Sequence, residues 1–273
     1  MEKRQPVKAL TIAGSDSGGA AGLQADLKTF TALGVYGMSA VTVVTAQNSV
    51  RVAALESMPA TLVARQIEAV LEDYGADAIK TGFVGSVKLL EAIAAVLGAY
   101  QDNHPLPLVV DPVLVNHRGE AMFGQEVVEA YRRLLLPRCT IVTPNRREAA
   151  LLCGHEVESW QDMTDAAQRL CEMGAGSALV TGGWHNEDYG DAFCDGRDVV
   201  FLELSHLKTS NTHGSGDTLS AAIAAFLAQE FPVLEAVRRA QTFTAAAIRG
   251  AVEWHMGGGH GPLNHMVRSE IGY

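Results

Sequence analysis

The sequence predicts an α/β fold in which a mostly parallel sheet is flanked by helices. Short apolar runs rich in β-branched residues alternate with longer runs rich in Ala, Leu and Glu that have helical spacing. This alternation is typical of βαβ units, in which each crossover helix packs on the sheet. No linker, low-complexity tract or repeat interrupts the pattern, so we expect a single domain over residues 1–273.

The runs predict the individual elements in chain order. Strands are expected at Lys8–Ala13, Met38–Ala46, Ala76–Lys80, Leu106–Asp111, Cys139–Thr143 and Ser177–Thr181. Helices are expected between them at Leu23–Leu33, Ala60–Asp73, Val87–Ala99, Gln125–Leu135 and Met163–Met173. Gly190–Asp195 and Asp198–Leu204 flank an Asp-Gly-Arg turn, which predicts a β-hairpin at a sheet edge. Two helices are expected to follow, at about Asp217–Gln229 and Val233–Arg249.

Composition excludes several classes of protein. The chain has 273 residues and a formal net charge of -10, so it lacks the basic footprint that nucleic acids and anionic membranes require. No apolar run reaches the roughly 20 residues that span a bilayer, and no signal-peptide core is present, which favours a cytoplasmic protein. The four cysteines stand far apart without a C-x-x-C pair, as expected of reduced thiols.

The strongest local signal for chemistry is the run Thr212-His213-Gly214-Ser215-Gly216-Asp217-Thr218 before an Ala-rich helix. Small residues at a helix start leave backbone N–H groups free to bind one anion, aided by the helix dipole. Asp217 has two interpretations: an ordinary N-cap, or a general base for a substrate hydroxyl beside a phosphoryl group. The chain has no Walker A motif and no complete G-x-G-x-x-G, which disfavours P-loop and simple Rossmann enzymes.

A second group lies after two other strands. Asn145 and Glu148 are three residues apart at a predicted helix start, where they form either a capping box or an oxygen-rich region for Mg²⁺. Asp111 ends another strand, at the edge where open α/β sheets place ligands. Together with Asp217 these side chains are expected to converge on one sheet edge.

The N-terminal turn and the second strand carry a third group. Gly14 and Asp16 follow the first strand, where the carboxylate either grips a small polar ligand or braces a tight turn. Gln47 ends the second strand, and its amide offers a donor and an acceptor in one plane for a pyrimidine or pyridine edge. The alternative is a loop glutamine bonded only to water.

Several of these motifs together resemble one enzyme family. They are Thr11-Ile12-Ala13-Gly14-Ser15-Asp16, Gln24-Ala25-Asp26-Leu27-Lys28-Thr29-Phe30, Ala46-Gln47-Asn48, Lys80-Thr81-Gly82, Asp111-Pro112-Val113, Thr143-Pro144-Asn145, Thr181-Gly182-Gly183, Asn211-Thr212-His213-Gly214-Ser215-Gly216 and Gly259-His260-Gly261-Pro262 with His265. In this order they are similar to the hydroxymethylpyrimidine and phosphomethylpyrimidine kinases of thiamine biosynthesis, in the ribokinase superfamily. The resemblance implies a ribokinase-like sheet of about eight strands with helices on both faces, a homodimer, and transfer of the ATP γ-phosphate to a hydroxymethylpyrimidine and then to its monophosphate.

The resemblance also implies roles for the residues singled out above. Gln47, with Asp16 and Gly14 nearby, would bind the pyrimidine. Gly214, Ser215 and Gly216 would form the catalytic anion hole, and Asp217 would be the catalytic base beside it. Thr181, Gly182 and Gly183 would border ATP, with Asn145 and Arg118 on its phosphates, while Glu148, Asn145 and Asp111 would face Mg²⁺.

The chain departs from the family pattern at three places. Asp217 stands where close relatives usually have Cys, His117-Arg118-Gly119 replaces a Lys-Ser-Gly flap, and Ala20 replaces a glycine in the first turn. These departures leave two alternatives open: a pyridoxine, pyridoxal or pyridoxamine kinase, and a non-catalytic sensor of a pyrimidine or vitamin.

Overall fold

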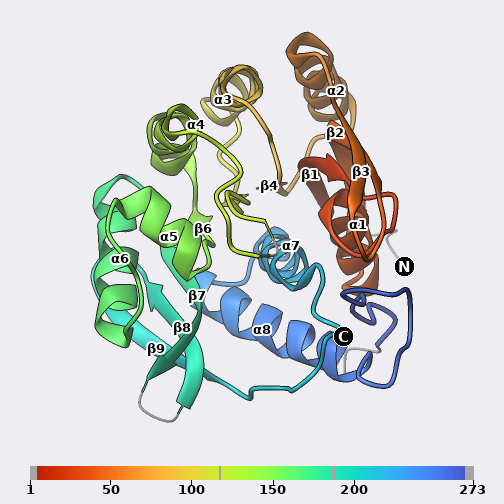
Figure 1. Ribbon diagram of the computed structural model, residues 1–273. Helices are drawn as coiled ribbons and strands as arrows, with labels where there is room; N and C mark the ends of the chain where they lie inside the picture. Colours follow the sequence, from red (N-terminus) through yellow and green to blue (C-terminus); the bar gives the residue numbers. More distant parts are fainter. Residues whose placement is uncertain (1–4, 117, 186–187, 268–273) are drawn as a thin grey trace.

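The computed structural model, which describes residues 5–116, 118–185 and 188–267, contains one sheet that runs through the molecule. Its nine strands in the described residues lie in the order β3-β2-β1-β4-β5-β6-β7-β8-β9 (Figure 1). They are β1 (Lys8–Ser15), β2 (Tyr36–Gln47), β3 (Val52–Ser57), β4 (Ala78–Thr81), β5 (Leu108–Val110), β6 (Ile141–Val142), β7 (Ala178–His185), β8 (Asp188–Cys194) and β9 (Val199–Leu204). From β2 to β7 all neighbours are parallel, whereas β3, β8 and β9 pair antiparallel at the edges. The predicted mostly parallel sheet is confirmed.

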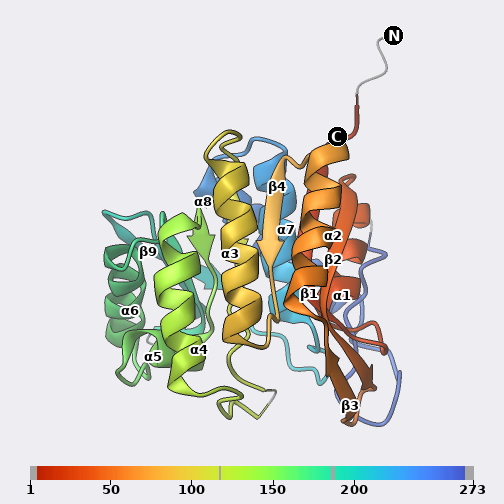
Figure 2. The same ribbon diagram turned by 90° about the horizontal axis from the view of Figure 1, so that it is seen from above.

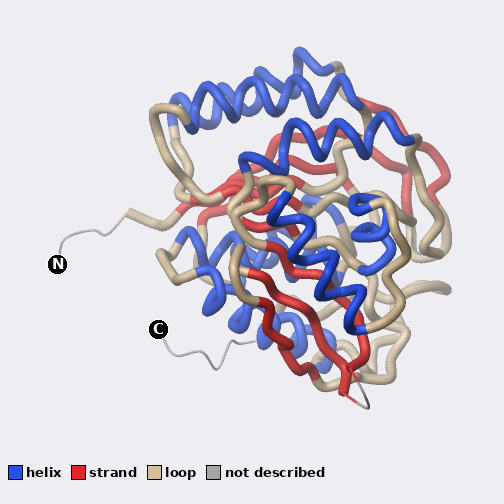
Figure 3. The backbone as a smooth tube through the Cα atoms, turned by 90° about the vertical axis from the view of Figure 1, so that its left-hand side faces the viewer, coloured by secondary structure: helices blue, strands red, loops and turns tan. Residues whose placement is uncertain are grey.

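Helices cover both faces of this sheet, as Figure 3 shows for the tube as a whole. They are α1 (Gly22–Ala32), α2 (Ala60–Asp73), α3 (Val87–Gln101), α4 (Gln125–Ala130), α5 (Arg146–Cys153), α6 (Trp160–Glu172), α7 (Ser215–Ala228) and α8 (Val233–Arg249). One core joins α2 to α6 with one face of the sheet, and the other joins α1, α7 and α8 with the opposite face. None of the described helices is long and apolar enough to cross a membrane.

Alternation along the strands separates the two cores. On β1, Leu10 and Ile12 belong to the first core and Ala9 to the second. On β5, Leu108 and Val110 face the first core while Val109 faces the second. Because side chains alternate between the faces of a strand, strands buried on both faces read as continuous apolar runs, which is the pattern of the sequence.

The structure differs from the predicted elements in three places. β3 was not predicted, because all its residues are exposed and it therefore lacks a burial period. The single helix expected at Gln125–Leu135 ends as α4 at Ala130 and continues as a π-helical turn over Tyr131–Leu135. α5 is a short helix missing from the predicted elements, although a helix start at Asn145 was expected. The predicted hairpin is confirmed by the antiparallel pair of β8 and β9.

Candidate active site

The first turn of α7 is the place where the sequence predicts an anion hole. Gly214 is the N-cap with φ 84°, and a Cβ there would overlap with the carbonyl oxygen of Ala20, so this position requires glycine. The Ser215 amide donates to the carbonyl of Thr212 at 3.1 Å. Apart from its chain neighbours and the backbone of its own helix, no atom of the described residues lies within 4 Å of a Cβ built on Gly216. Open space therefore lies beside first-turn amides that have no partner within the helix.

Asp217 is the third residue of α7 rather than its cap. The N-cap interpretation is wrong, because the helix begins at Ser215, two residues earlier than expected. The Asp217 side chain is 17% exposed, and its Oδ1 lies 3.2 Å from the ammonium of Lys80. This carboxylate is thus held at one oxygen and reaches the open side of the helix start.

Lys80 is the buried cation at the centre of the site. Its Nζ donates to Asp26 at 2.8 and 2.9 Å as well as to Asp217 at 3.2 Å, and neither Lys80 nor Asp26 is exposed at all. Burial by itself would lower the pKa of Lys80, but Asp26 and then Asp217 outweigh that effect and raise it. The ammonium is therefore charged, and its three donors match three carboxylate contacts.

Asp111 and Glu148 form a second buried acidic pair. Burial raises the pKa of Asp111 to about 6, and burial together with the charge of Asp111 raises that of Glu148 to about 8. Asp111 accepts a hydrogen bond from Ser220 at 2.8 Å. Glu148 accepts the amides of Leu114 at 2.9 Å and of Asn145 at 3.0 Å.

The capping-box interpretation of Asn145 and Glu148 is confirmed. Asn145 Oδ1 accepts the amides of Arg147 and Glu148, while the Glu148 side chain accepts the amide of Asn145. Within the described ranges, no group of three or more His, Cys, Asp and Glu side chains is arranged to hold a metal ion. A Mg²⁺ that brings phosphate and water ligands needs only one or two protein carboxylates, and the pair Asp111 and Glu148 fits that smaller requirement.

Asp16 braces the glycine turn between β1 and α1. Its oxygens accept the amides of Gly18 at 2.8 Å, Ala20 at 3.0 Å and Ala21 at 2.9 Å. The structural interpretation of Asp16 therefore accounts for most of its bonding capacity. Ala20 is not among the described non-glycine residues with positive φ, so this replacement fits the turn without strain.

Gln47 lies beside a residue of the α7 motif. Its Nε2 is 3.3 Å from Nε2 of His213, which in turn lies 3.8 Å from Asp16 Oδ2. Because an amide nitrogen only donates, the ring nitrogen of His213 accepts in this pair. Gln47 is therefore not a loop residue bonded only to water; β2 and the α7 motif meet at it. Gly14 adjoins the same corner, where a Cβ would lie 3.3 Å from the ring of Phe83.

The segment Thr181-Gly182-Gly183 of β7 lies next to the capping box, where the register of β7 with β8 shifts between Val180 and Gly183. Thr181 forms an isolated parallel bridge with Asn145, and Gly182 has φ 82°. The Gly182 amide donates to Asp191 Oδ1 at 2.9 Å, and Gln241 donates to Asp191 Oδ2 at 2.8 Å. Burial raises the pKa of Asp191 to about 6. This carboxylate connects the irregular part of β7 to α8.

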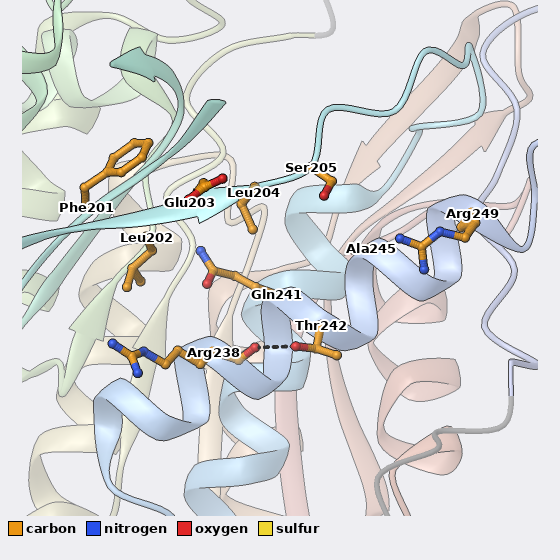
Figure 4. A pocket seen from close by; sticks show the side chains of 10 residues that line it. All are labelled: Phe201, Leu202, Glu203, Leu204, Ser205, Arg238, Gln241, Thr242, Ala245 and Arg249. Carbon is orange, nitrogen blue, oxygen red and sulfur yellow. Dashed lines mark hydrogen bonds between the residues drawn. The ribbon is translucent and has the colours of Figure 1, made fainter. Parts of the chain in front are cut away.

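A cavity of about 460 Å³ lies between β9 and α8 on the far side of Gln241. Figure 4 shows Leu202 and Leu204 facing Gln241 and Thr242 across it. Its remaining lining includes Ala245 and the stems of two arginines. None of the predicted site residues lines this cavity, but Gln241 connects it through Asp191 to Gly182.

The segment around Arg118 is fastened to the start of α5. Nη1 of Arg147 donates to the carbonyls of Arg118 at 3.2 Å and Gly119 at 3.1 Å. Gly119 has φ 76°. The predicted flap residue His117 lies outside the described residues. Arg147, whose amide donates to Asn145 Oδ1, thus holds the backbone of Arg118 near Asn145.

Several functional candidates were not identified from the sequence. Lys80 and Asp26 entered only as members of motifs, and Asp191, Gln241 and Arg147 were not singled out at all. A lysine in a predicted buried strand was the one available signal, because such a residue requires a carboxylate partner. The other three act through contacts between distant segments, which no local pattern encodes.

Comparison with known proteins places this geometry in a family. The sequence profile described as phosphomethylpyrimidine kinase matches residues 16–264. A hydroxymethylpyrimidine/phosphomethylpyrimidine kinase of Rhizobium meliloti is 44% identical over 262 residues, which cover 95% of this chain and 97% of that protein.

Solved structures agree on the fold. An ADP complex of Bacillus subtilis pyridoxal kinase has a TM-score of 0.87 at 37% identity and covers 96% of this chain and 98% of its own. A phosphomethylpyrimidine kinase of Clostridium difficile has a TM-score of 0.79 at 36% identity, covering 89% of this chain and 99% of its own.

Proposed function

This chain belongs to the phosphomethylpyrimidine kinase family and is a phosphotransferase, and from that premise we propose how its own residues carry out the reaction. The substrate is the hydroxymethyl group of 4-amino-5-hydroxymethyl-2-methylpyrimidine, which receives the γ-phosphoryl group of ATP in thiamine biosynthesis. Its monophosphate is the substrate of a second transfer. The observation that carries the assignment of roles is the partly exposed Asp217 beside the open space at Gly216.

In this proposal Asp217 accepts the proton of the substrate hydroxyl as the new bond to phosphorus forms. Lys80 holds one carboxylate oxygen and leaves the other for the hydroxyl. The amides at the start of α7, with Gly214, Ser215 and Gly216 shaping the turn, stabilise charge on the transferred phosphoryl oxygens.

The pyrimidine ring would lie against Gln47, near Gly14 and the braced turn of Asp16. Gln47 presents its carbonyl oxygen and one remaining N–H, because its other N–H is directed at His213. That pairing suits an aminopyrimidine edge, which offers a ring acceptor next to an amino donor. Asp16 contributes by holding the turn and facing His213 rather than by a direct ligand contact.

ATP would lie along the opposite side of the site. The β9 side of the cavity has Leu202 and Leu204 but also Glu203, and the α8 side has Gln241 and Thr242 (Figure 4). Apolar surface with a few polar groups suits a purine base. Asp191 and Gly182 then lead from the base toward Thr181 and the capping box. Gly183 continues that segment of β7, and Arg118 and Asn145 would border the phosphates.

Mg²⁺ bound with ATP would be held by Asp111 and Glu148, with Asn145 adjacent, and would neutralise phosphate charge. Both carboxyl groups are buried and have raised pKa values, so a nearby cation favours their ionised forms. Glu148 also holds the backbone at Leu114 and Asn145 in place, and Asp111 accepts the hydroxyl of Ser220.

The replacement Asp217→Asn tests the proposal. Loss of the base should lower kcat by about 10²-fold or more while KM changes little. Asp195→Asn, which changes an exposed carboxylate in the β8–β9 turn, is the matched control and should retain full activity. ADP release with the pyrimidine and with its monophosphate is the assay. Near-normal kcat in Asp217→Asn would overturn the base role.

Pyridoxal kinase activity is the second candidate, favoured by the similarity to the Bacillus subtilis pyridoxal kinase. A pyridine with a hydroxymethyl group presents a ring nitrogen to Gln47 but no adjacent amino group. Measuring kcat/KM for pyridoxal beside the pyrimidine decides between the two substrates. If neither compound causes ADP release, the chain would instead be a non-catalytic sensor, although a sensor does not need the pairing of Asp217 with Lys80.

Arg118 is proposed to serve the second phosphorylation in place of the flap lysine. The replacement Arg118→Gln should lower kcat/KM for the monophosphate by at least about tenfold more than for the alcohol, because only the former brings an additional phosphate. Equal losses for both substrates would contradict this role.

The β2–β3 edge is proposed as the surface of a homodimer. Val44, Val50, Val52 and Leu55 are 45–63% exposed there, and Figure 2 shows this ribbon extending beyond the neighbouring helices. Apolar clusters of this kind mark protein contacts. Leu55→Lys should therefore shift the sedimentation coefficient from dimer to monomer.

The free thiols of all four cysteines fit a reducing, cytoplasmic location.

A further inference from the structure

The buried lysine of the site has more partners than charge neutralisation requires. Lys80, at the end of β4, directs its ammonium at both oxygens of Asp26 on α1 and at Oδ1 of Asp217 on α7. Three elements that are far apart in sequence therefore meet at one nitrogen. A buried ammonium is costly unless every donor is used, and here the three donors face three oxygens.

The two carboxylates around Lys80 lie in different surroundings. Asp26 is fully buried and also accepts the hydroxyl of Thr11 at 2.5 Å, so it is fixed from two sides. Asp217 is 17% exposed and makes a single, longer contact with Lys80. Lys80 is thus anchored by Asp26 and offers its remaining donor to the carboxylate that faces the open space.

We propose that Lys80 and Asp26 are positioning residues that orient Asp217 and set its affinity for a proton. Lys80 fixes Oδ1 so that Oδ2 points toward the substrate hydroxyl, and its charge favours the ionised carboxylate. Asp26 shares that charge and keeps Asp217 a stronger base than a lone lysine would allow. This inference rests on the proposed role of Asp217.

In this proposal Lys80 and Asp26 act, through Asp217, at the transfer of the γ-phosphoryl group. The substrate oxygen forms a bond to the γ-phosphorus of ATP, and the bond from that phosphorus to the bridging oxygen breaks. The electron pair of the broken bond stays on the β-phosphate of ADP, and the hydroxyl proton passes to Oδ2 of Asp217 and then to solvent.

A cysteine placed at position 217 would lie in the same field of Lys80 as the carboxylate it replaces. A neighbouring cation stabilises a thiolate as it stabilises a carboxylate. The replacement Asp217→Cys therefore turns the position into a probe of the field of Lys80 that does not depend on catalysis.

The first experiment measures the pKa of the introduced thiol from the pH dependence of its alkylation by iodoacetamide, followed by mass spectrometry of the peptide around residue 217. In Asp217→Cys alone, that pKa should fall at least about one unit below the ordinary value near 8.5. Adding Asp26→Asn should lower it further, and adding Asp26→Asn with Lys80→Met should return it to about 8.5 or higher. The parent chain controls for its own cysteines, of which Cys139, Cys153 and Cys171 have raised pKa values.

The second experiment measures kcat against pH in variants that retain Asp217. Asp26→Asn should move the acid limb to lower pH, and Asp26→Asn with Lys80→Met should move it to higher pH and lower kcat at neutral pH by about tenfold or more. The double replacement removes the buried pair together, so that neither charge is left alone. Lys88→Met, on the exposed surface of α3, is the matched control and should leave the profile unchanged.

Opposite shifts of the acid limb would support the proposal, since a merely structural role would lower activity without moving the limb in two directions. Equal thiol pKa values in all three cysteine variants, or the same limb in all lysine and aspartate variants, would overturn it. Failure of the base assignment gives a different result: Asp217→Asn would keep near-normal kcat while the thiol values still diverged.

Discussion

Two glycines at the start of α7 offer a direct test of the site, because they differ in what a methyl group would meet. Gly214 has φ 84°, and its added Cβ would overlap with the Ala20 carbonyl. The left-handed conformation costs about 1–2 kcal/mol for alanine, and overpacking adds about 1–3 kcal/mol. Gly214→Ala should therefore lower the free energy of unfolding by about 2–5 kcal/mol, or Tm by roughly 4–10 °C.

Gly216→Ala is the matched replacement two residues later. Its Cβ would point into space free of described atoms, and alanine is the better helix former by up to about 1 kcal/mol, so stability should be unchanged or slightly higher. If the phosphoryl group occupies that space, kcat/KM for ATP should nevertheless fall at least about tenfold, which corresponds to roughly 1.4 kcal/mol.

Thermal unfolding and ADP release on the same two preparations measure both effects. Gly214→Ala should lower the free energy of unfolding, whereas Gly216→Ala should keep its stability and lose activity. A Gly214→Ala protein as stable as the parent would refute the close approach of the two turns. A fully active Gly216→Ala protein would refute the placement of the transferred group.

Three further outcomes follow from the surrounding contacts. Burial raises the pKa of Asp191 to about 6, so the stabilisation from its protonated carboxyl group is complete below pH 3.8 and is lost as pH rises through 6. Asp191→Asn should remove this pH dependence and raise the free energy of unfolding at pH 7, measured in urea, by up to about 3 kcal/mol. Burial and Lys28 lower the pKa of His265 to about 4, so its contribution is complete above pH 6.5 and is lost as pH falls through 4; His265→Gln should flatten that acid limb in thermal melts. Arg147→Ala removes two bonds to the backbone at 118–119 and should speed tryptic cleavage after Arg118 while Tm changes by less than about 2 °C.

The central sheet could be predicted because burial leaves a mark on each of its strands. Leu108, Val109 and Val110 face two cores in turn, so all three must be apolar. β3 lacks this pattern, since Val52 and Leu55 are half exposed. The π-helical turn at Tyr131 likewise depends on packing against neighbouring elements rather than on local propensity.

The site was predicted in the parts that depend on position along a strand or helix. Asn145 and Glu148 are three residues apart, and that spacing is sufficient for the capping box that the structure contains. The contacts of Lys80 were beyond reach, because its two partners are 54 and 137 residues away in the chain. Only the folded sheet brings β4 beside both α1 and α7.

The acidic chain and the anionic nucleotide repel each other at long range. The net charge is -10, and the buried cation Lys80 is already neutralised by Asp26 and Asp217, so it cannot attract ATP from a distance. Glu148 relieves part of the repulsion before the ion binds, because its pKa, raised to about 8, leaves it largely protonated near neutrality. In the proposed arrangement, affinity for ATP therefore arises from short-range contacts: first-turn amides of α7, the cavity beside α8, and the ion that accompanies the phosphates.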